Sequence, residues 1–219
     1  SFAVAFCEGP ITGIGRIWAD GKPMDLSGVT WRWYPGDEAQ ALAHYLQRFL
    51  DESRALPRES LCIEPGVAVW CVYVDLVVVS EDGNVLDAAA LAAVAALADA
   101  RLPRVLRCDD ASACVCTRER TEKLALTYLP VLATFGLVDA TYLLADVTAF
   151  EGSLTAAATH IGVADADDAD ADVFFVRHAG NALAARPQLH NHALLERCID
   201  AAQARARVLR KLLHESLKQ

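Results

Sequence analysis

The sequence predicts an α+β protein in which helices cover a mixed β-sheet. Three stretches carry apolar residues at the spacing of a helix, and β-branched apolar runs typical of strands lie between them. Hydrophobic residues make up 54% of the 219 positions, which is enough for a sizeable core and argues against disorder.

The first 34 residues differ from the rest of the chain. They are rich in Gly and Trp, and turn signals such as Gly9-Pro10 separate short strand-like runs. A helix is then expected over 37–53, because the acidic residues at its start suit the positive end of the helix dipole. Its apolar stripe ends before Pro57.

The segment 67–79 is expected to be the central strand of the sheet, because it is long, β-rich and apolar on both faces. A turn follows, and Asn84 is expected to cap a helix over 85–100, with Asp87 in the position of a capping-box acid. That helix is mostly Ala and Leu, so it can pack closely against a sheet. Pro103 is expected to close it.

Further strands and a last helix complete the expected fold. The strands are expected at 105–108, 112–117, 123–135, 140–146, 154–163 and 173–178. An acidic run from Asp165 to Asp172 lacks the Gly and Glu of an EF-hand loop, so we interpret it as a solvated hairpin turn. The segment 189–217 is expected to be one amphipathic helix with a basic end. For that basic cluster a solvated helix end is favoured over an RNA site; its members are Arg205, Arg207, Arg210 and Lys211.

Charge and cysteine usage narrow the function classes. A net charge of −9 disfavours a protein that binds nucleic acid alone and favours one piece of an assembly. Cys114 and Cys116 are a possible metal half-site, with His190 and His192 as the other cluster, but buried or edge thiols are favoured. We therefore expect no metal and no cofactor. No apolar stretch reaches the ~18 residues of a membrane span.

Several motifs follow, in order along the chain, the pattern of RNase PH-like exosome subunits. They are Pro35–Gln40, Leu61–Gly66, Val69–Leu76, Asp82–Ala89, Leu102–Val105, Tyr128–Val131 and Leu143–Thr148. From about residue 35 onward the sequence therefore resembles an RNase PH-like domain, a fold of the ribosomal protein S5 domain 2-like family. The resemblance implies the second half of that fold, with a mixed sheet covered by helices.

The same resemblance implies a site that lacks the residues needed for catalysis. Active members bind phosphate through a loop that reads Asp-Gly-Gly-Thr-Arg or close to it, and Val85 and Leu86 stand in place of its hydroxyl and its guanidinium. Active members also carry two Asp residues six apart. Asp146 matches the first, but Gly152 stands at the second. We therefore expect no catalytic residue.

The segment Phe2 to Gln40 resembles a different family, the tail hub proteins of phages and gene transfer agents. This resemblance rests on Cys7–Ile11, Ile14–Lys22 and Thr30–Tyr34. We therefore predict two parts: an N-terminal segment of separate origin, 1–34, and an RNase PH-like domain, 35–219. The first half of the RNase PH fold is expected ahead of residue 35 in the family and is not recognised in this chain.

The function implied by the longer resemblance is a non-catalytic structural subunit of the RNA exosome ring, which supports 3′–5′ RNA processing and degradation. The implied partners are other RNase PH-like subunits in a hetero-oligomeric ring, S1/KH cap proteins, and RNA that passes through the assembly. No membrane and no DNA are implied, and the implied location is the nucleus, the nucleolus and the cytoplasm.

Two alternatives stay open. One is a structural component of a phage-like tail or baseplate, motivated by residues 1–40. The other is a phosphorolytic 3′ exoribonuclease, which, like a metal-dependent hydrolase, would draw on Asp75, Asp82 and Asp146 as acids. Phosphorolysis is disfavoured because no Lys or Arg lies between Val67 and Ala100 to offset the carboxylates and attract phosphate.

Overall fold

The computed structural model describes residues 18–19, 22–23, 36–109, 113–138, 142–164, 172–180 and 191–217. The helices are α1 (Gly36–Ser53), α2 (Val85–Asp99), α3 (Ala149–Leu154) and α5 (Asn191–Ser216), with a 3-10 turn η1 (Arg58–Leu61). The strands are β1 (Trp18–Ala19), β2 (Lys22–Pro23), β3 (Cys62–Glu64), β4 (Ala68–Val69), β5 (Arg101–Asp109), β6 (Ala113–Lys123), β7 (Val131–Val138), β8 (Tyr142–Ala145), β9 (Ala157–Val163) and β10 (Val173–Gly180). The three helices expected from the sequence are confirmed as α1, α2 and α5.

Four strands form the central sheet, in the order β10-β9-β7-β8, and each neighbouring pair is antiparallel. The register of β7 against β9 places Val131 opposite Val163 and Leu137 opposite Ala157. The strands β5 and β6 form a separate two-stranded ribbon, and β3 pairs with β4. The α+β class is therefore confirmed, with one sheet at the centre.

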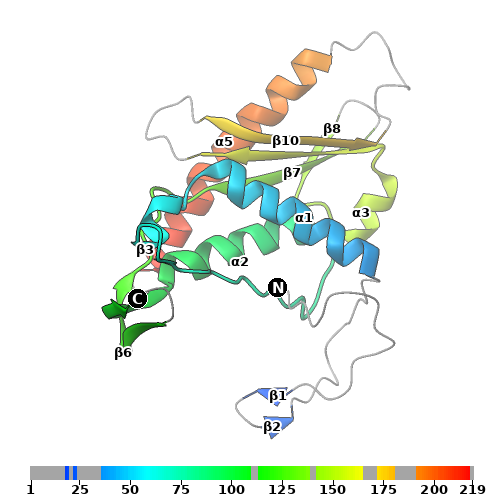
Figure 1. Ribbon diagram of the computed structural model, residues 1–219. Helices are drawn as coiled ribbons and strands as arrows, with labels where there is room; N and C mark the ends of the chain where they lie inside the picture. Colours follow the sequence, from blue (N-terminus) through cyan, green and yellow to red (C-terminus); the bar gives the residue numbers. More distant parts are fainter. Residues whose placement is uncertain are drawn as a thin grey trace.

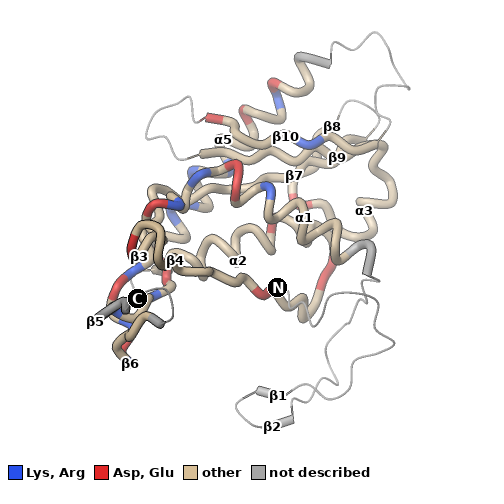
Figure 2. Tube along the Cα trace, viewed as in Figure 1, with Lys and Arg blue, Asp and Glu red and all other residues tan. Residues whose placement is uncertain are grey.

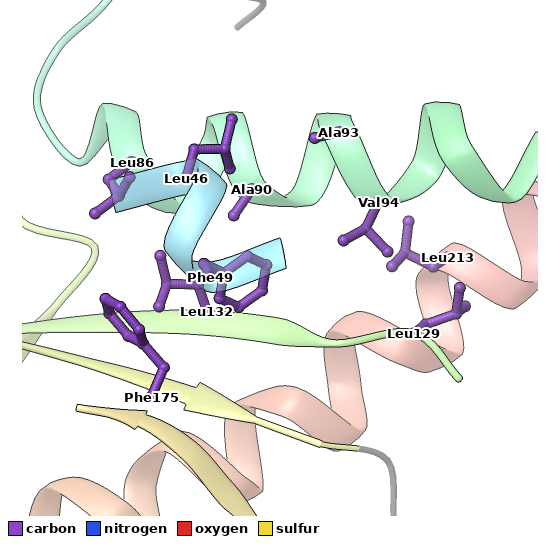
Figure 3. Packing of buried hydrophobic residues seen from close by; sticks show 10 residues of the cluster. All are labelled: Leu46, Phe49, Leu86, Ala90, Ala93, Val94, Leu129, Leu132, Phe175 and Leu213. Atoms are coloured by element: carbon purple, nitrogen blue, oxygen red, sulfur yellow. The ribbon is translucent and has the colours of Figure 1, made fainter. Parts of the chain in front are cut away.

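Helices cover both faces of this sheet (Figure 1). On one face α1 and α2 pack Phe49 and Val94 into a cluster with Leu132 and Phe175, as Figure 3 shows. On the other face, small residues of α5 such as Ala202 pack against β7 and β9. Burial of each large apolar side chain contributes ~1.5–3 kcal/mol. The hydrophobic core is therefore split into two layers by the sheet.

The prediction of a central strand at 67–79 is wrong. Only β4 is a strand in this segment, and the residues from Trp70 to Ser80 follow an irregular path with one isolated bridge. An apolar, β-branched run becomes a strand only where another strand pairs with its N–H and C=O groups. Within the described ranges, no strand of the central sheet pairs with this segment. Tyr73 is consequently 86% exposed.

β7 holds the central position instead. It is buried along nearly its whole length. Ala133 and Phe135 pack toward α5, whereas Leu132 packs toward α1 and α2, because alternate side chains of a strand point to opposite faces. The strand expected at 123–135 is therefore wrong at its start, since residues 124–130 lie between β6 and β7.

Other boundaries also differ from the prediction: β5 already begins at Arg101, ahead of the strand expected at 105–108, and β6 extends to Lys123, beyond the strand expected at 112–117. The strand expected at 154–163 begins only at Ala157, because the preceding residues form α3. A capping box starts α3: the Glu151 N–H donates to the Thr148 hydroxyl at 3.2 Å, and the Thr148 N–H donates to the Glu151 carboxylate at 2.9 Å. Pro103 does not close α2, which ends earlier; it lies within β5.

Some expectations fall outside the described residues. These are the tail-hub resemblance, apart from β1 and β2, most of the acidic run that begins at Asp165, and His190. β9 and β10 are antiparallel neighbours, as a hairpin connection through the acidic run requires. Among the helices that the structure describes, none has the length and apolar character to cross a bilayer.

One cysteine on the β5–β6 ribbon differs from the interpretation of the cysteines as buried or edge thiols. Cys114 is disulfide-bonded, so that interpretation is wrong for this residue. Cys116 is a free, half-buried thiol. A disulfide-bonded sulfur does not bind a metal as a thiolate. In the ranges that the structure describes, no group of three or more metal-ligating side chains lies together.

Candidate functional site

Two loops that are far apart in the sequence meet beside the first turn of α2. The Ala149 N–H, at the start of α3, donates to the Asp82 carbonyl at 2.9 Å. Gly83 has a φ of 91°, and a Cβ on it would lie 2.3 Å from the Val147 carbonyl oxygen. Only glycine fits this conformation and this close approach. The structure therefore brings together the two loops that the sequence assigns to the phosphate and the acid.

Asn84 links two carboxylates at this junction. Its Nδ2 donates to Asp87 Oδ2 at 3.1 Å and to Asp146 Oδ1 at 2.9 Å. Because both partners are acceptors, the NH₂ group of the amide must point at them. Asn84 occupies the N-cap position of α2 with a φ of 51°, but its side chain makes no cap hydrogen bond. The prediction that its side chain caps the helix is therefore wrong, and its role is to bridge.

Asp146 is held by groups of this chain on two sides. Besides the Asn84 amide, the guanidinium of Arg205 on α5 lies 3.6 Å from Asp146 Oδ2. Both side chains are partly exposed, so this ion pair is worth under ~1 kcal/mol. The carboxylate that matches the family's first acid is thus already paired within the fold.

The other positions predicted to be degenerate lie nearby, but they do not point into a common site. Leu86 is buried in the core cluster with Leu46 and Phe49. Val85 is half-buried in the first turn of α2. Gly152 is exposed in α3, and a Cβ there would meet nothing closer than 3.9 Å. A larger side chain therefore has room at position 152 but not at position 86.

Asp75 does not join the two loops. It is exposed on the irregular segment that was expected to be a strand, whereas Asp82 contacts the start of α3. The convergence of Asp75, Asp82 and Asp146 that hydrolysis would need is absent from the contacts of the described residues. The expectation that Asp75 lies inside a strand is wrong as well.

Behind the loops, a chain of polar side chains crosses the sheet. The Thr134 N–H and hydroxyl donate to the Asp87 carboxylate at 2.7 and 2.5 Å. On the other side of the hydroxyl, His160 Nδ1 lies 2.8 Å from Thr134 Oγ1. The chain continues to Arg177, whose guanidinium lies 2.8 Å from His160 Nε2 and 4.0 Å from the ring centroid of Tyr45. It therefore links α2 with the edge strand β10 and with α1.

Arg177 fixes the direction of every hydrogen bond in this chain. A guanidinium only donates, so His160 Nε2 must accept and His160 Nδ1 must carry the proton. That proton is donated to Thr134 Oγ1, which in turn donates its own proton to Asp87. Each donor then has an acceptor when the imidazole is neutral and the carboxylate is ionised.

Burial shifts the pKa values at both ends of this chain. It raises the pKa of Asp87 from 3.8 to about 6, opposed by the hydrogen bonds from Thr134 and Asn84. Burial, together with the positive charge of Arg177, lowers the pKa of His160 from 6.5 to about 4. Neutral pH therefore favours the protonation states that the hydrogen-bond directions require.

The sequence reasoning missed the polar chain. Thr134 interrupts the apolar strand β7, and His160 follows Thr159 within the mostly apolar β9; these interruptions are the signal that could have revealed them. Arg205 was assigned to a solvated helix end but pairs with Asp146. Arg210 was assigned to the same solvated end, which is wrong, because it is only 5% exposed and donates to main-chain carbonyls.

Comparison with known families finds a match over part of the chain. Residues 22–103 match the 3′ exoribonuclease family, domain 1, named RNase_PH. The match begins inside the segment 1–34 that the sequence assigns to a separate origin. It includes the loop before α2 but not the one that carries Asp146.

Exosome proteins are among the curated relatives. Exosome complex component Rrp45A of Arabidopsis thaliana is 30% identical over 190 residues, which are 84% of this chain and 59% of the relative. Exosome complex component Rrp42 of Pyrococcus abyssi is 39% identical over 104 residues, 48% of this chain and 38% of the relative. The chain thus spans less than two thirds of the length of either relative. The motifs predict a subunit similar to ribosomal RNA-processing protein 43, with 42 and 45 as alternatives, and the choice among them stays a prediction.

Solved exosome structures share the fold. The Archaeoglobus fulgidus exosome with RNA bound to the active site matches with a TM-score of 0.63 and 31% identity, over 83% of this chain and 64% of that one. An archaeal exosome core matches with a TM-score of 0.61 and 28% identity, over 86% of this chain and 66% of that one. The chain therefore has an RNase PH-like fold, and it is similar in sequence and in structure to components of the exosome core.

Proposed function

We propose that this chain is a non-catalytic structural subunit of an RNA exosome ring, which supports 3′–5′ RNA processing by contributing ring surface. Its relatives carry the names of exosome components, and its fold matches exosome cores. The proposed partners are other RNase PH-like subunits, S1/KH cap proteins and RNA. The proposed location, nucleus, nucleolus and cytoplasm, follows from the resemblance to exosome subunits. The proposed RNase PH-like domain is residues 35–219.

The observation that carries the non-catalytic part is the internal pairing of Asp146. An acid that assists a leaving group must be free to give or take a proton at the substrate. Here Asn84 donates a hydrogen bond to the Asp146 carboxylate, and Arg205 forms an ion pair with it. Val85 offers no hydrogen-bond donor to a phosphate ion. Loss of a charged contact to the transition state commonly costs ~10²–10³ in rate, so loss of several removes useful catalysis.

An RNA degradation assay tests this directly. Purified chain is incubated with labelled single-stranded RNA, phosphate and Mg²⁺, and the expected result is no release of nucleoside diphosphates. A Gly152→Asp variant restores the second acid at a position with room for it, and it too is expected to be inactive. Phosphate-dependent release of diphosphates by the unchanged chain would contradict the proposal, and metal-dependent release of monophosphates would favour hydrolysis.

Co-purification tests the assembly. Recovery of RNase PH-like subunits and S1/KH proteins with the tagged chain is the expected result. Recovery of tail or baseplate components instead would favour the phage-like alternative suggested by residues 1–40.

A further inference from the structure

The ribbon of β5 and β6 carries a net positive charge on an otherwise acidic chain. Its two strands contain six Lys or Arg and three Asp or Glu, whereas the whole chain has a net charge of −9. The ribbon is separate from the central sheet. Figure 1 shows β6 at one end of the molecule, and Figure 2 shows both basic and acidic residues at this end. Positive charge is thus concentrated on one exposed element.

The register of the ribbon gathers three cations on one face. Arg101 lies directly opposite Lys123. The register then shifts between Leu102 and Pro103, which brings Arg120 opposite Pro103. Because side chains alternate along a strand and the bulge adds one residue to β6, Arg120 lies on the same face as the first pair. All three side chains are exposed.

These cations have no counter-charge in the described part of the fold. None of the three takes part in an ion pair with another described residue. Glu122 lies opposite Leu102 and so on the other face, and Glu119 is exposed further along β6. Like charges directly opposite each other destabilise a strand pair, so the pair of Arg101 and Lys123 weakens the ribbon unless an anion lies against it.

We infer that this face of the β5–β6 ribbon binds the phosphate backbone of single-stranded RNA. Three exposed cations lie on this face: Arg101, Arg120 and Lys123. Two of them are Arg, whose guanidinium binds phosphate through paired hydrogen bonds. The two strands contain no aromatic residue for base stacking, so binding is independent of base sequence. The inference rests on the proposed function, which brings RNA to this chain, and extends it by naming the surface.

Two triple variants of equal net charge test the inference. The ribbon variant is Arg101→Gln, Arg120→Gln and Lys123→Gln. The matched control removes three exposed cations elsewhere: Arg54→Gln, Arg58→Gln and Lys211→Gln. Binding of a labelled oligouridylate is measured by fluorescence anisotropy over a series of salt concentrations. The ribbon variant is expected to bind about tenfold more weakly and to lose about two from the slope of log affinity against log salt, since each phosphate contact on a single strand contributes ~0.7. The control stays close to the unchanged chain.

Three outcomes would overturn the inference, and a fourth would overturn only the proposed function. If both triple variants weaken binding equally, only net charge matters and the inference fails. If polyglutamate of equal charge displaces the RNA as effectively as unlabelled RNA does, the face fits an acidic protein instead, and the inference fails again. Co-purification of the same variants distinguishes this inference from the proposed function. If the ribbon variant recovers ring partners and binds RNA as tightly as the unchanged chain, only the inference about the ribbon fails. Ribbon-dependent binding without ring partners refutes only the proposed function.

Discussion

Asp87 and His160 share the hydroxyl of Thr134, and their pKa values shift in opposite directions from their ordinary values. Asp87 binds its proton more tightly in the folded state, so its contribution to stability is present below pH 3.8 and is lost as the pH rises through about 6. His160 binds its proton less tightly in the folded state, so its contribution is present above pH 6.5 and is lost as the pH falls through about 4. Between these limits the two slopes oppose each other.

Single substitutions should expose each slope. In His160→Asn, the unfolding free energy is expected to fall by about 1–3 kcal/mol as the pH rises from ~4 to ~6, since the Asp87 effect is no longer offset. In Asp87→Asn, the unfolding free energy is expected to rise by a similar amount as the pH rises from ~4 to ~6.5, since the His160 effect is no longer offset. Urea unfolding at a series of pH values measures both. Parallel pH profiles for the two variants would show that the two groups do not titrate as described.

At the scale of elements, the junction of the Asp82–Asn84 loop with the start of α3 depends on one glycine. Gly83 combines a positive φ with a backbone contact that leaves no room for a Cβ. Gly66, between β3 and β4, also has a positive φ, 78°, but a Cβ there would meet nothing within 4 Å. The two glycines therefore separate the cost of the backbone conformation from the cost of the contact.

The Gly83→Ala and Gly66→Ala variants form a matched pair. The Gly66 change is expected to cost ~1 kcal/mol, from conformation alone. The Gly83 change is expected to cost at least ~2 kcal/mol more, because the loops must move apart to admit the methyl group. Denaturant unfolding gives both values, and equal costs would mean that the junction yields without strain.

At the scale of the whole molecule, Arg210 joins α5 to the sheet. Its buried guanidinium donates to the carbonyls of Leu129, Val163 and Ala164 at 3.0, 2.9 and 2.6 Å. Leu129 lies just before β7, Val163 is the last residue of β9, and Ala164 follows it directly. One side chain therefore satisfies main-chain acceptors on two strands and fixes the position of the helix over them.

Arg210→Met should weaken the whole fold. The methionine keeps most of the apolar stem but leaves three carbonyls without this donor, so a loss of about 2–5 kcal/mol in unfolding free energy is expected. Lys211→Met, at the exposed neighbouring position, is expected to change stability by less than ~0.5 kcal/mol. Thermal unfolding of the two variants is the measurement. Similar melting temperatures would contradict the role assigned to Arg210.

The helices α1, α2 and α5 could be predicted because a helix satisfies its own backbone, so its apolar periodicity is visible within one segment of sequence. The same reasoning failed for 67–79. Its composition suits a strand, but a strand takes its hydrogen bonds from another part of the chain, and β7 rather than this segment found partners on both sides. The Thr148 and Glu151 capping box was a local signal that went unused.

Some parts of the candidate site could likewise be predicted from the sequence, and others could not. Its loops, with Gly83 and Asp146, could be found from motifs, since those residues lie in short contiguous patterns. The partners of Asp146 could not, because Asn84 and Arg205 come from different elements and reach it only once α2 and α5 pack on opposite faces of the sheet. The sequence by itself determined the three long helices, the family motifs and the missing donors. Tertiary structure alone decided which charges are paired, which are buried and which strand lies at the centre, because each depends on neighbours distant along the chain.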